Sequence, residues 1–197
     1  MMASFRMSKT GVNACYLIQS TKKHSDPRGS FQEIYRQDEF GSKGLPITWC
    51  QANLSRSWKN VVRGLHIQRN NPQGKLVQCV NGRIWDVCLD VRKDSPTFME
   101  WTGHLLHEGM ALYCPPGTAH GFLAMEEKNI VYYNCTTLYD AESDGGINPF
   151  DEELNLPWPI DGGKKAIVSD KDKNLPMMQQ WLDDPRGITY GDRKSEA

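Results

Sequence analysis

Short segments rich in β-branched and aromatic residues recur along this chain, separated by Gly, Pro, Asn and Asp. In RIWDVCLDV, residues 83–91, the apolar residues at 85, 87, 89 and 91 alternate with Asp86, Cys88 and Asp90. Such period-2 alternation is what a half-buried strand needs. Many short strands with turn residues between them are typical of a sandwich or barrel of the jelly-roll kind. The sequence therefore predicts an all-β fold, with strands over 13–19, 30–36, 47–55, 61–68, 75–80, 83–91, 98–106, 111–116, 120–125 and 130–138.

The C-terminal quarter of the chain has a different pattern. From Asp140 onward it is too rich in Gly, Pro and acidic residues for regular strands, which predicts a long ordered loop or a lid. Residues 177–182, MMQQWL, follow a proline and predict a short helix. A length of 197 residues suits one domain. We expect a single domain over 1–197, with a core from 12 to 182 and loosely ordered ends at 1–11 and 186–197.

Charge and cysteine usage limit the possible partners and the compartment. Twenty-three basic and 24 acidic side chains give a net charge of -1, so no global field attracts nucleic acid or a membrane surface. The six cysteines are dispersed in apolar stretches without a C-x-x-C pair, which favours buried free thiols in a reducing cytosol over disulfides or a zinc site. The N-terminus lacks the apolar run of a signal peptide, and no segment approaches membrane-spanning length. We expect a soluble, cytoplasmic protein.

One motif raises the question of a metal ion. PPGTAH, residues 115–120, is similar to the second motif of the cupin superfamily. Cupin metal sites also use a His-x-His pair and a nearby Glu, since a divalent ion needs three or four converging N or O ligands. Here the first motif offers only His66, Ile67 and Gln68. The sequence therefore predicts no metal site.

The histidines differ in their surroundings. His104 and His107 are three residues apart in a strand and so point to opposite faces, and His24 stands in a polar loop. His66 stands in an apolar strand, where a packed core histidine is the ordinary expectation. An imidazole is also the side chain best suited to accept a proton at neutral pH, with a carboxylate to fix its tautomer. Local sequence alone leaves these alternatives open.

Further motifs favour the catalytic alternative. Together they occur in the order and near-spacing of the dTDP-4-dehydrorhamnose 3,5-epimerases, and the chain resembles that family over residues 26–180. The motifs are DPRGSFQE (26–33), RGLHIQ (63–68), QGKLV (73–77), DVCLDVRKDSPTF (86–98), PPGTAHGF (115–122), Tyr133, LPWP (156–159) and VSDKD (168–172).

The resemblance implies a fold, a substrate class and a set of site residues. It implies a cupin-type double-stranded β-helix (jelly roll), a homodimer, and a reaction without metal or other cofactor on a nucleotide-linked 4-keto-6-deoxy sugar. By motif, His66 is the general base, Asp172 pairs with it, Tyr133 returns a proton from the opposite side of the ring, and Lys75 lies near the C4 carbonyl oxygen. Arg28 resembles the arginine that reaches the nucleotide diphosphate, in its own site or in that of the partner subunit. The substrate-binding residues are Arg28, Glu33, Gln51, Asn53, Arg63, His120 and Asp151.

These residue types fit the implied chemistry. A proton on carbon beside a ketone is acidic only because the resulting anion delocalises onto oxygen. The enzyme therefore needs a base at carbon and a fixed positive donor at oxygen, which His66 and Lys75 supply. Inversion then requires a proton from the other face, and a phenol such as Tyr133 can donate one.

The resemblance also has a geometric consequence and two departures. Arg63 and His66 are three residues apart, so a regular strand would place them on opposite faces; a bulge or bend is expected at Gly64. Ser30 and Leu138 stand where several family members have aromatics near the nucleotide base. Phe31 or Tyr139 could substitute for them, and thymidine remains the expected base.

Other interpretations remain open at this level. Asp86 and Asp90 also fit as ion-pair partners of Arg83 or Arg92, and Asp172 as a turn residue. The leading function is epimerisation of C3 and C5 of dTDP-4-dehydro-6-deoxyglucose, giving dTDP-4-dehydro-L-rhamnose on the route to dTDP-L-rhamnose. The alternatives are epimerisation at one carbon, a 3,4-ketoisomerase on a related nucleotide sugar, and a non-catalytic sugar-binding cupin.

Overall fold

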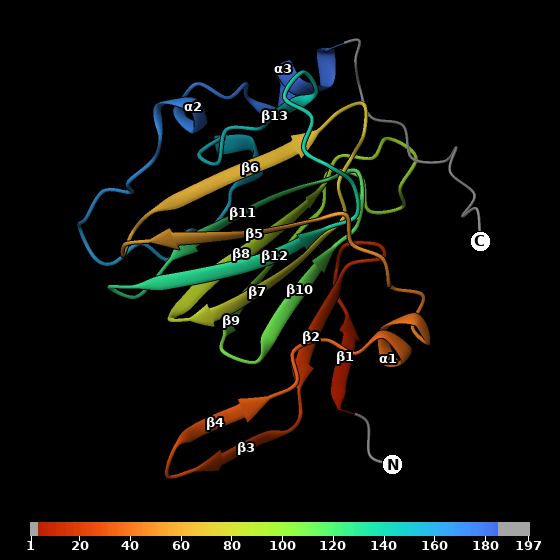
Figure 1. Cartoon of the computed structure of the whole chain (residues 1–197). Helices are drawn as coiled ribbons and strands as arrows, with labels where there is room; N and C mark the ends of the chain where they lie inside the picture. The colour runs from red at the N-terminus through yellow and green to blue at the C-terminus, as the bar shows by residue number, and fades with distance from the viewer. Residues whose placement is uncertain (1–3, 185–197) are drawn as a thin grey trace.

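Two antiparallel β-sheets packed face to face form the body of the structure, a computed structural model that describes residues 4–184 (Figure 1). The six-stranded sheet has the order β1 (Phe5–Lys9), β2 (Tyr16–Ser20), β10 (Met110–Cys114), β7 (Lys75–Asn81), β12 (Asn129–Cys135) and β5 (Gln51–Ser57). The five-stranded sheet has the order β13 (Asp144–Gly146), β6 (Val62–Gln68), β11 (Thr118–Ala124), β8 (Arg83–Asp90) and β9 (Trp101–His107). This is the cupin-like jelly roll that the sequence predicts.

The main core lies between the two sheets. Inward-facing side chains of alternate residues meet there, including Val77 and Leu112 from the six-stranded sheet and Cys88 and Phe122 from the five-stranded sheet. The alternation expected for β8 is present, but its outward-facing residues, such as Val87, are buried as well. The prediction of a half-buried strand was therefore wrong, because the C-terminal part of the chain covers the outer face of this sheet.

That covering segment runs from residue 140 to the end of the described chain and is drawn in cyan to blue above and to the left of β6 (Figure 1). Ile147, Leu154, Met178 and Trp181 pack from it onto the five-stranded sheet. Its regular elements are β13, the 3-10 helix η1 (Glu152–Leu154), α2 (Asp170–Lys173) and α3 (Met178–Asp183). The helix predicted at 177–182 is confirmed.

The expectation of no regular strand in this segment was wrong at β13, which pairs with β6 in register from Asp144 opposite Gln68 to Gly146 opposite His66. Glycine makes this pairing possible, because a Cβ on Gly146 would collide with the backbone oxygen of Leu65. The glycine richness that suggested a loop is thus what lets the backbone approach the sheet edge.

The N-terminal residues are more regular than expected. Residues 5–9, predicted to be loosely ordered, form β1 and pair with β2. The ring of Phe5 packs edge-on against Phe40 of α1 (Gln37–Gly41), with ring centroids 5.3 Å apart, and the backbone N–H of Phe5 donates to the Glu39 carboxylate. These contacts anchor the strand. Residues 1–3 and the predicted loose end at 186–197 lie outside the described residues.

A two-stranded hairpin projects away from both sheets (Figure 1). Its strands are β3 (Lys23–Asp26) and β4 (Gly29–Gln32). The strand predicted over 30–36 therefore ends at Gln32, before α1. The side chains of the hairpin are exposed, and Phe31 is 72% accessible. An apolar ring this exposed is a candidate for contact with another surface.

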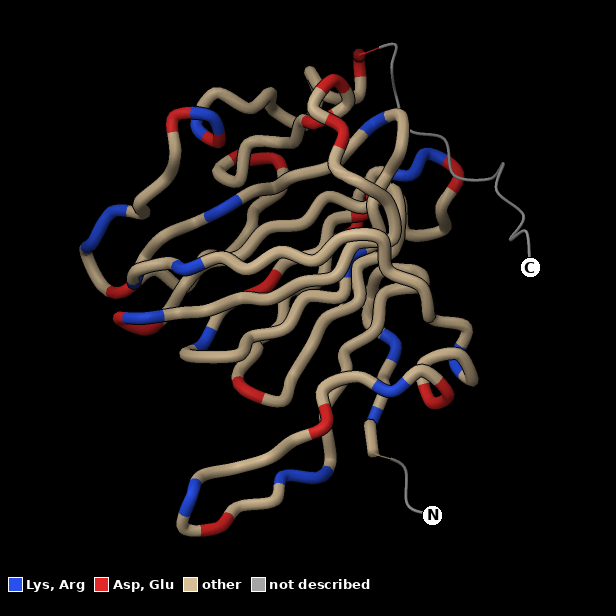
Figure 2. Tube along the Cα trace, viewed as in Figure 1, with Lys and Arg blue, Asp and Glu red and all other residues tan. Residues whose placement is uncertain are grey.

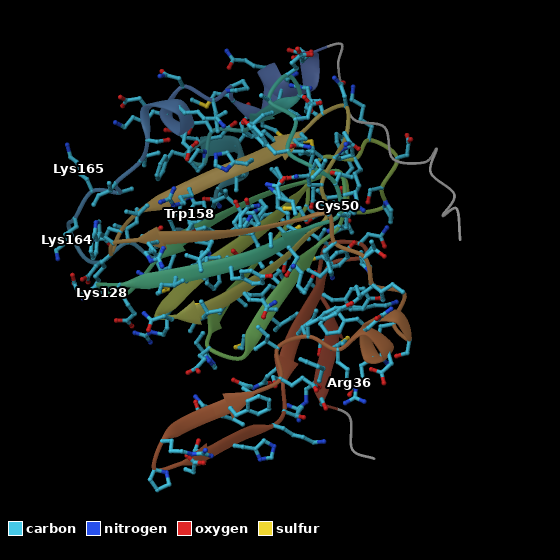
Figure 3. The ribbon with its side chains drawn as sticks, viewed as in Figure 1. Arg36, Cys50, Lys128, Trp158, Lys164 and Lys165 are labelled. Carbon is cyan, nitrogen blue, oxygen red and sulfur yellow. The ribbon has the colours of Figure 1, made fainter. Side chains whose placement is uncertain are left out.

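Charged residues and cysteines follow the sequence expectations with one exception. Lys and Arg segments alternate with Asp and Glu along the trace (Figure 2). All six cysteines are free, and the prediction of buried thiols is confirmed except for Cys50, which is exposed just before β5 (Figure 3). Within residues 4–184, none of the helices has the length and apolar character needed to cross a membrane.

Candidate active site

A break in the pairing of β6 and β11 shapes the site. His66 lies opposite His120, but Arg63 lies opposite Phe122, so three steps along β6 match two along β11. Gly64 has a φ of +110°, a conformation that favours glycine, and the Gly64–Leu65 peptide bond is cis. The bulge predicted at Gly64 is confirmed by this register shift.

His66 is paired with a carboxylate from the far end of the chain. Its Nε2 lies 2.7 Å from Oδ1 of Asp172, and the backbone N–H of Gly64 donates to Oδ2 at 3.1 Å. Burial acts to raise the pKa of Asp172, but the hydrogen bond and charge of His66, with the Gly64 bond, outweigh it and lower this pKa. Asp172 is therefore ionised at neutral pH and holds the Nε2 proton, which leaves Nδ1 of His66 free to accept another.

The sequence around Asp172 explains how the carboxylate is presented. Ser169 caps α2, and its side chain accepts a hydrogen bond from the backbone N–H of Asp172. The predicted turn role of Asp172 and its pairing with His66 are therefore both present. Asp172 is buried while the His66 side chain is 32% exposed. The imidazole of His66 is thus accessible, and the carboxylate that orients it is shielded.

His66 opens into a cavity of about 350 Å³ between the edges of the two sheets. Strands β5, β7 and β12 supply one wall, and β6 supplies the other. Of the predicted residues, His66, Lys75, Tyr133, Gln51 and Asn53 line this cavity together. A hydrogen bond of 3.0 Å from Gln51 Nε2 to Asn53 Oδ1 fixes two of its polar groups.

Burial shifts the pKa of the two other proposed catalytic groups, Lys75 and Tyr133. Desolvation lowers the pKa of Lys75, whose Nζ lies 3.4 Å from the backbone oxygen of His66. Desolvation also raises the pKa of Tyr133, against the opposing effect of the nearby Arg63 charge. The Tyr133 phenol is therefore protonated at neutral pH and can act as a proton donor.

Arg63 and His120 lie next to the cavity and do not line it. The Arg63 guanidinium donates from Nε to Ser57 Oγ at 3.0 Å, and it is close enough to influence the charge state of Tyr133. His120 is buried beside His66, with its Nε2 2.8 Å from Oδ1 of Asp86.

Three predicted substrate-binding residues lie elsewhere. Arg28 is at the tip of the hairpin and pairs with Asp26 at 2.6 Å, and Glu33 lies near Arg36, which Figure 3 places beside α1. Asp151 is buried and structural: its Oδ1 accepts from the backbone N–H of Glu153, and its Oδ2 accepts from that of Met178. Asp151 therefore ties η1 to the start of α3.

The structure adds cavity residues that the sequence did not predict, and it places there Tyr139, which the sequence named only as a possible aromatic near the nucleotide base. Tyr139, Asp144 and Lys171 close one side, with Tyr139 Oη 3.0 Å and Lys171 Nζ 2.5 Å from the same oxygen of Asp144. Gln68 and Gln73 also line the cavity. Lys171 directly precedes Asp172, so the sequence alone could have predicted its place beside the His66–Asp172 pair. Asp144 had no such signal, because its position depends on the pairing of β13 with β6.

Two buried clusters bring potential metal ligands together. One contains the sulfurs of Cys15, Cys88 and Cys114, and the other contains Asp86, Cys114 and His120, with ligand atoms within 4.8 Å of one another in each. Neither cluster includes His66, the histidine of the first cupin motif. A metal bound in either cluster would therefore not use the His66–Asp172 pair as a ligand.

The arrangement supports acid–base chemistry on a bound molecule. It combines an oriented imidazole, a buried lysine and a protonated phenol around one polar cavity. A jelly roll with these groups defines a cupin-type enzyme that moves protons at carbon or oxygen.

Comparisons with known proteins agree with this class. The family model described as dTDP-4-dehydrorhamnose 3,5-epimerase matches residues 9–180. The dTDP-4-dehydrorhamnose 3,5-epimerase of Methanothermobacter thermautotrophicus is 42% identical, over 91% of this chain and 97% of its own. The dTDP-4-dehydrorhamnose 3-epimerase of Streptomyces niveus is 37% identical, over 90% of this chain and 86% of its own.

A solved structure matches over nearly the whole chain. The dTDP-6-deoxy-D-glucose-3,5-epimerase of Legionella pneumophila Philadelphia 1, in complex with dTDP-4-keto-L-rhamnose, matches with a TM-score of 0.87 and 32% identity, over 95% of this chain and 99% of that one. The chain belongs to the dTDP-4-dehydrorhamnose 3,5-epimerase family.

Proposed function

We propose that this protein is a dTDP-4-dehydrorhamnose 3,5-epimerase. It converts dTDP-4-dehydro-6-deoxy-D-glucose to dTDP-4-dehydro-L-rhamnose by inverting C3 and C5 beside the C4 ketone. The observation that carries the proposal is the His66–Asp172 pair, which faces the same cavity as Lys75 and Tyr133. Membership of the epimerase family supports the substrate class.

The residues divide the reaction between them. His66 removes the proton from carbon with its free Nδ1, while Asp172 stabilises the imidazolium that forms. Lys75 stabilises the negative charge that develops on the C4 oxygen, and a preorganised donor of this kind contributes on the order of 3 kcal/mol to lowering the barrier. Tyr133 donates a proton to the opposite face of the planar intermediate. Gln51 and Asn53 are positioned to hydrogen-bond the sugar nucleotide.

A second candidate is epimerisation at C3 alone. The family relative from Streptomyces niveus, described as a 3-epimerase, favours considering it. NMR of the reaction in deuterated water separates the two: deuterium and inverted configuration at both C3 and C5 support double epimerisation, and deuterium with inversion at C3 only supports epimerisation of a single carbon. Absence of exchange at both carbons would contradict either proposal and leave a sugar-binding role.

The position of Arg28 supports a homodimer as part of this proposal. Its hairpin projects away from the chain's own cavity, and Arg28 and Phe31 at its end are both exposed (Figure 1). In a dimer the hairpin can carry Arg28 to the diphosphate in the partner subunit's cavity, with Glu33 close behind. The free cysteines support a reducing, cytoplasmic location.

A further inference from the structure

The barrel interior contains a second His–Asp pair, beside the first. His120 of β11 is the direct cross-strand neighbour of His66 of β6, and paired residues on adjacent strands project to the same face, with Cβ atoms about 5 Å apart. Nε2 of His120 lies 2.8 Å from Oδ1 of Asp86, as Nε2 of His66 lies 2.7 Å from Oδ1 of Asp172. The two pairs have similar geometry and very different surroundings.

The His66–Asp172 and His120–Asp86 pairs differ in the solvent access of the histidine and in the hydrogen bonding of the carboxylate. The His66 side chain is 32% exposed, and both oxygens of Asp172 have hydrogen-bond partners. The side chains of His120 and Asp86 are 8% and 0% exposed. Moreover, Oδ2 of Asp86 is buried and has no hydrogen-bond partner among residues 4–184. A lone negative charge on Asp86 would therefore be poorly compensated.

Among residues 4–184, the charge with the largest effect on Asp86 is that of His120 itself. His104, its cross-strand partner on β9, bonds to Thr102 Oγ1, and burial lowers the pKa of His104. On β8 and β10, burial raises the pKa of the Cys88 and Cys114 thiols, so neither thiol carries charge at neutral pH. Compensation must come from within the His120–Asp86 pair itself.

A pair with no net charge has two possible forms. Either Asp86 is ionised and His120 is an imidazolium, or Asp86 is protonated and donates to Nε2 of a neutral imidazole. Nδ1 of His120 carries a proton in both forms. The third arrangement, an ionised Asp86 with a neutral His120, leaves Nδ1 bare and a net negative charge in the barrel interior.

We propose that Asp86 is a positioning residue that keeps a proton on Nδ1 of His120, so that His120 is a fixed hydrogen-bond donor to an oxygen of the bound sugar while its neighbour His66 is the base. The proposal rests on the function proposed above for the sugar, but the protonation of His120 does not depend on it. Two histidines side by side thus have opposite roles. The carboxylate of Asp172 is hydrogen-bonded at both oxygens and its histidine is open to the cavity, whereas the carboxylate of Asp86 has one unpaired oxygen and its histidine is buried.

The protonation states can be measured directly on the wild-type protein. With ¹⁵N-labelled histidine, NMR reports which ring nitrogens carry protons, and the chain has only five histidines. His120→Gln and His66→Gln variants assign the signals. Between pH 7 and 8 we expect a protonated Nδ1 for His120 and an unprotonated Nδ1 for His66. An unprotonated Nδ1 on His120 would overturn the proposal, whether or not the protein turns over any sugar.

Variants then test the role of each partner. Asp86→Leu keeps the branched shape of the side chain, with larger methyl groups and no polar atom, and we expect the Nδ1 proton of His120 to be no longer fixed in it. An Nδ1 that stays fully protonated would show that Asp86 does not determine this proton. His120→Leu removes the donor, and about 10²-fold loss of kcat with unchanged dTDP affinity is expected.

His120→Asn provides the matched control, since its amide nitrogen takes nearly the position of Nδ1. It should retain more kcat than His120→Leu, without moving the pH profile that reports His66. Equal losses in both variants would contradict a donor role. If the wild-type protein lacks epimerase activity, only the proposed function fails, because the NMR result stands by itself.

Discussion

His66 and Asp172 lie 106 residues apart in the chain and are joined by a 2.7 Å contact between Nε2 and Oδ1. The contact forms because α2 packs against β6, where the backbone N–H of Gly64 binds the second oxygen of the same carboxylate. The carboxylate therefore holds both the base and the strand that carries it. Its position couples the shape of the β6 bulge to the tautomer of the proposed base.

Removing the proposed base or its partner should abolish turnover and leave binding intact. His66→Ala and Asp172→Asn are expected to lower kcat by about 10²- to 10⁴-fold, the usual contribution of general base catalysis, while dTDP affinity measured by calorimetry stays within a few-fold. His107→Ala, an exposed histidine of β9, is the control and should behave as wild type. Normal turnover in both site variants would favour a binding protein.

Tyr133→Phe should separate proton removal from inversion. Without the phenol, the carbanion can be reprotonated only from the side of His66, so deuterium from solvent should enter the sugar with its configuration retained. NMR in deuterated water measures both label and configuration. Tyr132→Phe is the matched control, because Tyr132 does not line the cavity. Efficient inversion by Tyr133→Phe would assign the donor to another group.

Arg28 should act in the cavity of the partner subunit. Arg28→Ala is expected to weaken dTDP binding in a homodimer without altering the His66–Asp172 pair. At a substrate concentration too low for Arg28→Ala to turn over, mixing Arg28→Ala and His66→Ala subunits should restore activity, because each mixed dimer has one site with both residues intact. No recovery after verified subunit exchange would place Arg28 in its own subunit's site or outside the reaction.

Gly64→Ala should destabilise the fold. Gly64 has a positive φ, and an added Cβ would lie 2.6 Å from both Gly121 Cα and the backbone oxygen of His120. The expected loss in the free energy of unfolding exceeds about 1 kcal/mol, as measured by urea denaturation. Gly11→Ala, where an added Cβ meets nothing within 4 Å, should change it by less than about 0.5 kcal/mol.

The stabilising effect of Asp172 should depend on pH in a defined direction. Its pKa is lowered in the folded protein, so its ionised form stabilises the fold above the ordinary carboxyl pKa of about 4, and this contribution is lost as the pH falls through the folded value. The stability difference between wild type and Asp172→Asn should therefore shrink from pH 7 to pH 3. A difference that is constant over this range would contradict the lowered pKa.

Local patterns in the sequence determined much of the fold. Alternating residues in 83–91 predicted β8, and turn residues between apolar runs predicted a jelly roll, because side-chain period and backbone propensity are local properties. The three-residue spacing of Arg63 and His66 even predicted the bulge at Gly64. The resemblance of ordered motifs supplied the pairing of His66 with Asp172, which no local pattern contains.

Only the tertiary structure decided which polar residues share a cavity and which are buried alone. Asp144 reaches the cavity through the pairing of β13 with β6. Asp151 is also acidic and nearby in sequence, but its carboxylate accepts hydrogen bonds from backbone N–H groups of η1 and α3. The alternation in 83–91 places Asp86 on the polar face of its strand, yet the packing of the two sheets buries this residue against His120. Burial and hydrogen-bond partners depend on segments far apart in the chain, and they set the charge on which each role depends.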